Sequence, residues 1–267
     1  MKPSVDPAIE RVADTGSTND DLLARVHAAS AAGAATFAPC LLVADRQRAG
    51  RGRHGRRWHA EPAASLTFSI AWPCARDDLS GLSLAIGSAL ADALDPPDAP
   101  ARIGLKWPND LWLLDRVNDG AGASGRKLAG VLVETVPFGA GRVAIVGVGI
   151  NVGAQSVSDA ASGFASLDEI DPGATPATAL GRVAPAMFDA LRRFDRAGFA
   201  DFAARYAGRD VLRGRRVAGA GAEGEIEGVA AGVDGDGALL VATASGTVAV
   251  QSGEWRLARA EPAGSPC

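Results

Sequence analysis

The sequence has few of the features that would place a protein in a membrane or outside the cell. It has three cysteines in 267 residues, and because the number is odd and the spacing unpatterned, neither a disulfide framework nor a zinc site is predicted. The N-terminal stretch, residues 1–7, lacks the apolar core of a signal peptide, and no uninterrupted apolar run approaches the ~20 residues of a membrane span. We therefore expect a cytoplasmic protein without membrane contact.

A surplus of basic residues is also absent. Lysine and arginine number 27 against 31 aspartates and glutamates, which gives a net charge of −4 and a pI near 5.4. This balance argues against a protein whose surface is generally basic and binds nucleic acid, so no DNA partner is expected. With 47% hydrophobic residues, the chain is long enough for one large domain and a small one.

The most distinctive stretch is an arginine- and glycine-rich segment, Asp45 to Trp58, directly after the apolar run Cys40 to Ala44. Such a run predicts a buried strand that opens into a loop. Glycine lets the backbone approach a ligand closely, and arginine offers a planar fork for phosphate or carboxylate. The segment, called the arginine loop below, is therefore predicted to bind an anion rather than to be a solvated basic loop.

Two nucleotide-binding patterns are nearly present and are rejected. Gly50, Gly52 and Gly55 fit the dinucleotide fingerprint, but that fingerprint needs a helix at its third glycine. Here the strand-like Leu66 to Ile70 follows instead. Residues 120–127 nearly match a Walker A loop, but Arg126 stands where the lysine should be and no Ser or Thr follows.

Other polar residues lie at element ends, where a structural and a functional interpretation both remain open. Residues 17–20 precede a helical pattern and suit an N-cap as well as ligand contacts. Pro108 indicates an edge, bulge or bend, which would hold Lys106 and Asp110 rigidly, although an Asx turn fits Asn109 and Asp110 equally well. Lys127 opens a strand predicted over 128–134, paired with 142–147.

The apolar run Ala144 to Ile150 predicts a central strand covered on both faces. Its Gly147 and Gly149 would leave room for a ligand on one side. Asn151, just beyond, offers both a donor and an acceptor. Apolar stripes predict core helices over 80–94, with Ser80 as cap, and over 177–206. After Gly208, short β patterns with glycine turns suit a small SH3-like barrel.

Several segments, in this order along the chain, together resemble the biotin protein ligase family, whose members attach biotin to a lysine of a carrier protein. The resemblance runs from about residue 9 to 258 and is carried by Gly16-Ser-Thr-Asn19, Gly50-Arg-Gly-Arg-His-Gly-Arg-Arg-Trp58, Lys106-Trp-Pro-Asn-Asp110, Lys127-Leu-Ala-Gly130 and Gly147-Val-Gly-Ile-Asn151. His54 departs from the family, which usually has arginine or glutamine there, so no role is given to it. Phe164 lies where some relatives place a tryptophan over adenine.

The resemblance implies an α+β fold with a mixed central sheet and helices, similar to class II aminoacyl-tRNA synthetases, plus an SH3-like C-terminal barrel. The expected domains are a catalytic domain over 1–209, the SH3-like domain over 210–260 and a tail over 261–267. No N-terminal DNA-binding domain is expected, because only about a dozen residues precede Ser17.

The resemblance also implies the site residues, with biotin and ATP as substrates and Mg²⁺ as cofactor. Catalytic roles fall on Arg53, Lys106, Asp110 and Lys127, with Asp110 either a magnesium ligand or a base. Biotin-binding roles fall on Ser17, Thr18, Asn19, Gln47, Arg51, Gly52, Arg53, Lys127, Gly147 and Gly149. ATP- or adenylate-binding roles fall on Arg53, Arg56, Trp58, Lys106, Asn109, Asn151 and Phe164.

The expected function is an ATP-dependent ligase that forms biotinyl-5'-AMP and transfers biotin to a lysine of a biotin carboxyl carrier protein; whether it is a homodimer is left open. Two alternatives remain. A lipoate or octanoate ligase or transferase would accept a fatty acyl chain in place of biotin. A nucleic-acid-binding module using the arginine loop would show steep salt dependence, and the acidic net charge argues against it.

Overall fold

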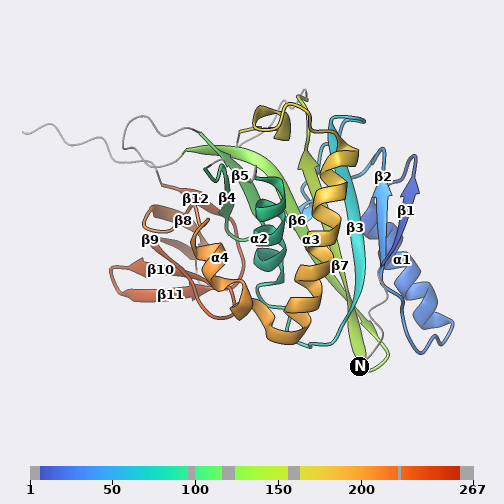
Figure 1. Ribbon diagram of the computed structural model, residues 1–267. Helices are drawn as coiled ribbons and strands as arrows, with labels where there is room; N and C mark the ends of the chain where they lie inside the picture. Colours follow the sequence, from blue (N-terminus) through green and yellow to red (C-terminus); the bar gives the residue numbers. More distant parts are fainter. Residues whose placement is uncertain (1–6, 96–99, 116–123, 156–162, 222–223, 259–267) are drawn as a thin grey trace, which may run out of the picture.

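The computed structural model describes residues 7–95, 100–115, 124–155, 163–221 and 224–258. Figure 1 shows a large sheet with helices packed on it and a smaller sheet formed by the C-terminal strands. The large sheet has seven strands in the order β1-β2-β3-β7-β6-β5-β4. Their bounds are β1 Ala8–Val12, β2 Cys40–Ala44, β3 Ser65–Cys74, β4 Ile103–Lys106, β5 Asp110–Leu114, β6 Gly125–Phe138 and β7 Gly141–Asn151. Because β1 pairs with β2 in parallel and the other neighbours are antiparallel, the sheet is mixed, as predicted.

The central strand is β7, as the unbroken apolar run predicted. It pairs with β3 on one side and β6 on the other, and from Val143 to Asn151 every residue is buried. Because side chains alternate across a strand, Val146 and Val148 face one side of the sheet while Ile145, Gly147 and Gly149 face the other. This alternation separates the apolar core from the face that carries the cavity described below.

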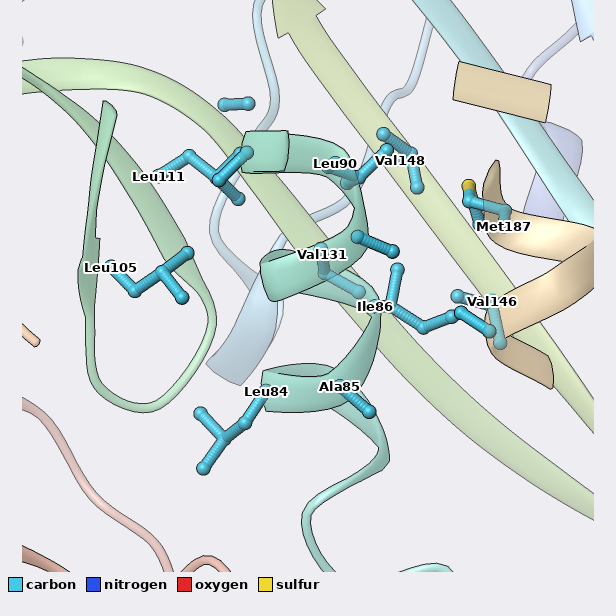
Figure 2. Packing of buried hydrophobic residues seen from close by; sticks show 14 of the residues in the cluster. Leu84, Ala85, Ile86, Leu90, Leu105, Leu111, Val131, Val146, Val148 and Met187 are labelled. Carbon is cyan, nitrogen blue, oxygen red and sulfur yellow. The ribbon is translucent and has the colours of Figure 1, made fainter. Parts of the chain in front are cut away.

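Two long helices, α2 (Leu82–Leu94) and α3 (Pro176–Ala197), cover the first of these faces. Figure 2 shows Ile86 and Leu90 of α2 packed against Val131, Val146 and Val148, with Met187 of α3 close by. Burying such side chains typically stabilises a fold by about 1.5–3 kcal/mol each. The chain continues through a short 3-10 segment, Gly198–Asp201, into the small helix α4 (Ala203–Ala207).

Helix α1 (Thr18–Ala31) lies on the opposite face. Its Leu22 and Val26 form a second buried cluster with Val143 and Ile145 of β7. Past Ile145 the strand presents Gly147, Gly149 and finally Asn151 to this side, so the apolar packing under α1 ends there. None of the helices in the described part of the chain has the length and apolarity that crossing a bilayer requires.

The C-terminal strands form an antiparallel sheet of five, in the order β11-β10-β9-β8-β12. Their bounds are β8 Arg216–Gly221, β9 Gly224–Val233, β10 Leu239–Thr243, β11 Gly246–Val250 and β12 Trp255–Leu257. The short β patterns after Gly208 were thus assigned correctly, and closure into an SH3-like barrel stays a prediction. Trp107 Nε1, beyond β4, donates to Gly237 O at 2.9 Å, which ties this sheet to the larger one.

Three local predictions need correction: the start of α2, the length of β6, and the helix predicted over 177–206, which is divided at Gly198 (φ 68°) into α3, a 3-10 segment and α4. The arginine loop joins β2 to β3, with only the 3-10 turn Arg53–Gly55 inside it, so rejecting the dinucleotide fingerprint was correct. The prediction that Ser80 caps α2 was wrong. The cap is Gly81 in the left-handed region, φ 76°, where a Cβ would lie 2.7 Å from Phe199, while Ser80 N donates to Asp78. Strand β6 is also longer than the predicted 128–134.

Candidate active site

A cavity of about 150 Å³ opens beyond α1, where glycines replace apolar side chains on the sheet. Its floor is formed by the same face of three neighbouring strands, because Gly147 and Gly149 of β7 pair with Ser69 and Thr67 of β3, and Gly149 also pairs with Gly130 of β6. The start of α1, the arginine loop, the β4–β5 turn and the C-terminal sheet supply the walls. The lining residues are Ser17, Thr18, Asn19, Gln47, Arg51, Gly52, Arg53, Arg56, Arg57, Trp58, Thr67, Phe68, Ser69, Asn109, Asp110, Lys127, Gly130, Val131, Leu132, Gly147, Val148, Gly149 and Glu254.

The two floor glycines make room for protein side chains rather than leaving open space, which corrects the expectation from the sequence. A Cβ on Gly147 would lie 2.2 Å from Asn19 Oδ1, and a Cβ on Gly149 would lie 2.3 Å from the Trp58 ring. Glycine at these positions therefore lets Asn19 and Trp58 lie flat on the sheet. A ligand in the cavity would contact those side chains.

One end of the cavity is neutral, polar and buried. Ser17 is the N-cap of α1, and its Oγ faces Asp20 N at 3.5 Å. Thr18 and Asn19 form the first turn behind it and are 3% and 4% exposed. The capping and ligand-binding interpretations are thus compatible, because one residue caps the helix while its neighbours line the cavity.

These side chains are joined by short hydrogen bonds. Gln47 Oε1 accepts from Thr18 N at 2.7 Å and lies 3.0 Å from Thr18 Oγ1. The Thr18 hydroxyl is 2.6 Å from Ser69 Oγ, which donates to Asn19 Oδ1 at 2.6 Å. Asn19 Nδ2 in turn donates to Glu134 Oε2 at 2.7 Å. Buried polar groups that are paired in this way hold one another in fixed orientations.

The other end of the cavity carries charge. Lys127 Nζ lies 2.7 Å from Asp110 Oδ1 and 5.6 Å from the centre of the Trp58 ring. Arg53 Nη1 donates to Gly253 O at 3.3 Å and to Asn109 Oδ1 at 3.5 Å. Several cations therefore converge where the arginine loop meets the β4–β5 turn, an arrangement that binds an anion such as a phosphate or carboxylate.

Carboxylates partner other arginines of the loop, while Arg57 donates to Arg48 O at 3.0 Å. Arg51 pairs with Asp20 at 2.6 Å and with Glu134 at 2.9 Å. Arg56 pairs with Glu254 of the C-terminal sheet. Burial lowers the pKa of Arg53, and the nearby negative charges of Asp110 and Glu254 oppose that shift.

Most residues predicted from the sequence line this cavity, and the exceptions are Lys106, Asn151 and Phe164. Lys106 lies beside it, with Nζ 5.3 Å from the centre of the Trp112 ring. Burial lowers its pKa, an effect that Asp110 opposes and Lys127 reinforces. Phe164 forms a bridge with Lys127 at the end of β6.

The amide of Asn151 is engaged within the protein. Its Nδ2 donates to Lys127 O at 3.3 Å and to Ala165 O at 3.0 Å, and its Oδ1 accepts from Gln155 at 3.3 Å. The structure therefore does not offer this amide to a ligand. It uses Asn151 to join the ends of β6 and β7 to the segment after residue 163.

Sequence reasoning missed several residues at the site. Ser69 and Thr67 are polar positions two apart in an otherwise apolar strand, a pattern that points both to the cavity face. Glu134 is likewise a lone charge in the apolar stretch of β6. Arg57 and Glu254 carried no comparable signal, and Glu254 comes from the separate C-terminal sheet.

A carboxylate site that could hold a metal ion by itself is not present in the ranges that the structure describes, since no group of three or more His, Cys, Asp or Glu side chains is gathered there. Magnesium, however, is commonly bound through one or two carboxylates together with the phosphates of a nucleotide. Asp110 at the charged end fits that arrangement.

Comparison with known proteins agrees with the fold. Residues 34–151 match the sequence model of the biotin/lipoate A/B protein ligase family, and residues 213–254 match that of the biotin protein ligase C-terminal domain. The mixed sheet with its glycine floor and arginine loop therefore defines a member of the biotin/lipoate ligase class.

Individual relatives show to which family within this class the chain belongs. The chain is 35% identical over 263 residues to the biotin–[acetyl-CoA-carboxylase] ligase of Mycobacterium tuberculosis (strain ATCC 25618 / H37Rv), covering 92% of this chain and 87% of that one. It is 33% identical to the bifunctional ligase/repressor BirA of Escherichia coli (strain K12), covering 74% of this chain and 60% of that one. The Aquifex aeolicus biotin protein ligase, solved with biotin and ATP, superimposes with a TM-score of 0.74 at 27% identity, covering 95% and 99% of the two chains. The chain belongs to the biotin protein ligase family.

Proposed function

We propose that this chain is an ATP-dependent biotin–protein ligase that acts on a biotin carboxyl carrier protein. The observation that carries the proposal is a single cavity with a buried neutral polar end and a cationic end. Biotin has the same two-part character, with an uncharged ureido ring at one end and a carboxylate at the other. Thr18, Asn19 and Gln47 would bind the ring, while Lys127 and Arg53 would bind the carboxylate.

The first step joins biotin to AMP. A carboxylate oxygen attacks the α-phosphorus of ATP, the bond to the β-phosphate oxygen breaks, and pyrophosphate leaves. Lys127 and Arg53 offset the negative charge that gathers as the two anions meet, and a preorganised contact of this kind is worth about 10²–10³ in rate. Lys106 would act on the phosphates from its place beside the cavity. Magnesium bound with ATP would supply further positive charge, with Asp110 as its protein ligand.

The second step transfers the acyl group. The carrier lysine attacks the acyl carbon of biotinyl-5'-AMP as a neutral amine, an amide forms, and AMP leaves with the electrons of the cleaved bond. In its alternative role Asp110 accepts the amine proton, because its buried Oδ1 is paired with Lys127 at 2.7 Å and has no hydrogen-bond partner among the described residues. Base and metal ligand remain the two roles proposed for Asp110.

Fewer of the residues predicted to bind adenosine line the cavity. Arg56, Trp58 and Asn109 line the cavity near the cations and suit the nucleotide. Stacking of Phe164 on adenine is proposed from its position next to Lys127, and Asn151 would act by holding that segment in place. We further propose a catalytic domain over residues 1–209 and an SH3-like domain over 210–260, in a cytoplasmic enzyme that does not bind DNA.

Pyrophosphate exchange into ATP tests the proposal, with biotin or octanoate as the acyl substrate. Exchange should depend on biotin and magnesium, and an apo carrier domain should then gain the mass of one biotinyl group. Exchange that octanoate supports and biotin does not would reassign the chain to the lipoate side of the class.

A further inference from the structure

The hydrogen bonds at the neutral end of the cavity are more numerous than the protons available to fill them. Thr18 and Ser69 each carry one hydroxyl proton. Their oxygens make three short contacts, with Asn19 Oδ1 at 2.6 Å, with each other at 2.6 Å and with Gln47 Oε1 at 3.0 Å. Each contact needs a proton between its two oxygens. Because two protons are available for three contacts, one contact has no proton.

Glu134 decides which contact that is. A carboxylate only accepts hydrogen bonds, so Asn19 must turn its Nδ2 toward Glu134, at 2.7 Å, and its Oδ1 toward Ser69. Ser69 then donates its proton to Asn19. The Thr18 hydroxyl then has one proton for two acceptors, Ser69 Oγ at 2.6 Å and Gln47 Oε1 at 3.0 Å, and the shorter contact takes it.

The remaining pair of oxygens is left as two acceptors. Thr18 Oγ1 and Gln47 Oε1 lie 3.0 Å apart with no proton between them once Thr18 donates to Ser69. Among the described residues, Gln47 Oε1 then keeps one donor, the Thr18 N–H at 2.7 Å. Thr18 and Gln47 both line the cavity, and an N–H group from a ligand aimed between their two oxygens would relieve the repulsion.

Packing and charge hold Glu134 and Asn19 in this arrangement. The Asn19 amide lies on Gly147, where a Cβ would be 2.2 Å from its oxygen, so the side chain has little room to rotate. Arg51 donates to both oxygens of Glu134, at 3.0 and 2.9 Å, and so fixes the orientation of this side chain. A Glu134 amide, by contrast, could donate to Asn19 and allow the whole row to reverse.

We propose that Glu134 is a positioning residue that sets the direction of the hydrogen-bond row Thr18–Ser69–Asn19, so that the neutral end of the cavity accepts N–H donors. The identity of the donor, a ureido N–H of biotin, rests on the proposed function. Glu134 thereby contributes to substrate specificity through Asn19, without touching the substrate.

Glu134→Gln tests this with biotin and its cyclic-carbamate analogue, in which one ring N–H is replaced by oxygen. The wild-type protein should prefer biotin in kcat/KM of pyrophosphate exchange by about 100-fold or more, because the analogue presents an acceptor to two acceptors. In Glu134→Gln this preference should fall by about tenfold or more, with the loss in KM for biotin and little change in KM for ATP. A purely structural role would lower both activities together and leave the preference unchanged.

Glu227→Gln is the matched control, since Glu227 is also a strand glutamate paired with an arginine, Arg216, and lies on the C-terminal sheet. It should keep the wild-type preference. Ser69→Ala breaks the same row one step further along and should lower the preference as well, which keeps the test valid if Glu134→Gln does not fold.

Failure of this inference can be distinguished from failure of the proposed function. An unchanged preference in Glu134→Gln or in Ser69→Ala overturns the inference. So does a wild-type protein that accepts the carbamate as readily as biotin. A wild-type protein without any biotin-dependent exchange instead contradicts the proposed function.

Discussion

The two ends of the cavity are built in opposite ways. At the neutral end, Thr18, Asn19 and Ser69 are 3%, 4% and 0% exposed and come from a helix start and a central strand. At the charged end, the side chains of Lys127 and Arg56 are 31% and 67% exposed, and the arginine comes from a loop. The first end is fixed by packing, and the second by ion pairs that water screens.

This difference matches the tasks proposed for the two ends. A recognition site gains from polar groups that their neighbours hold rigidly, because each misplaced ligand group then leaves a buried group unsatisfied. A reacting centre needs cations that can exchange a protein carboxylate for a phosphate or carboxylate of the substrate. Asp110 and Glu254, which partner Lys127 and Arg56, would be exchanged in this way.

The largest expected effect lies at the charged end, with Lys127→Gln. Loss of this cation should lower the rate of biotin-dependent pyrophosphate exchange by about 10²–10³, judged from other single contacts to developing negative charge. The melting temperature should change little, because glutamine still offers a donor to Asp110. Arg11→Gln, which removes an exposed cation paired with Asp45, should leave the rate unaltered. A Lys127→Gln protein with normal exchange would mean that the cation does not contact the reacting groups.

The second-largest effect is expected at the neutral end, where a methyl group on the glycine floor should weaken biotin binding. Gly147→Ala places a methyl group 2.2 Å from Asn19 Oδ1, and the forced shift should cost about 1–3 kcal/mol and raise the dissociation constant for biotin by about tenfold or more. Calorimetric titration with biotin measures this dissociation constant.

Gly130→Ala is the matched control on the same floor. Its nearest neighbours would lie 3.5 Å from the new Cβ, an ordinary contact, so the affinity for biotin should barely change. Equal losses in Gly130→Ala and Gly147→Ala would show that the space above Asn19 is not what the glycine protects.

Much of this arrangement follows from local sequence patterns. The run Cys40–Ala44, the arginine loop and the strand after it were assigned correctly because a period of two and interleaved glycines are local signals. The strand near Lys127 was also a local signal, although β6 begins at Gly125 and Lys127 is its third residue rather than its first. Most of the site residues came from the resemblance to the family, whose motifs lie in the walls of the cavity.

The remainder depends on contacts between distant residues. Glu254 and Arg56 are 198 positions apart in the chain. No local pattern indicates that the residue before β12 will lie beside the arginine loop. Asn151 shows the reverse case. Its donors and acceptor suited a ligand, yet the fold uses them to hold Lys127 O, Ala165 O and Gln155. The chemistry of a side chain indicates which groups it can bind. It does not indicate whether those groups belong to a ligand or to the protein itself.

The pH dependence should separate Lys106 from the exposed cations of the charged end. Burial lowers the pKa of Lys106, so this lysine loses its charge at a lower pH than an ordinary lysine. If its charge assists ATP, kcat/KM for ATP should fall as the pH rises through that lowered pKa. Lys106→Arg should move the falling limb to higher pH, because a guanidinium stays protonated there. An unmoved limb would assign the pH dependence to another group.

The smallest effect is expected from Glu254→Gln, at the edge of the charged end. Glu254 pairs with Arg56, but the two side chains are 48% and 67% exposed, and exposed pairs typically contribute only about 0–1 kcal/mol. The KM for ATP should rise by no more than about fivefold, and the KM for biotin should not change, because Glu254 does not touch the neutral end. The difference from wild type should also shrink at high salt, which screens exposed charges. Glu227→Gln, on the same small sheet, controls for the loss of a surface charge. A rise in KM for biotin as large as that for ATP would break the division between the two ends, because it would mean that the C-terminal sheet holds the whole cavity rather than the arginine loop alone.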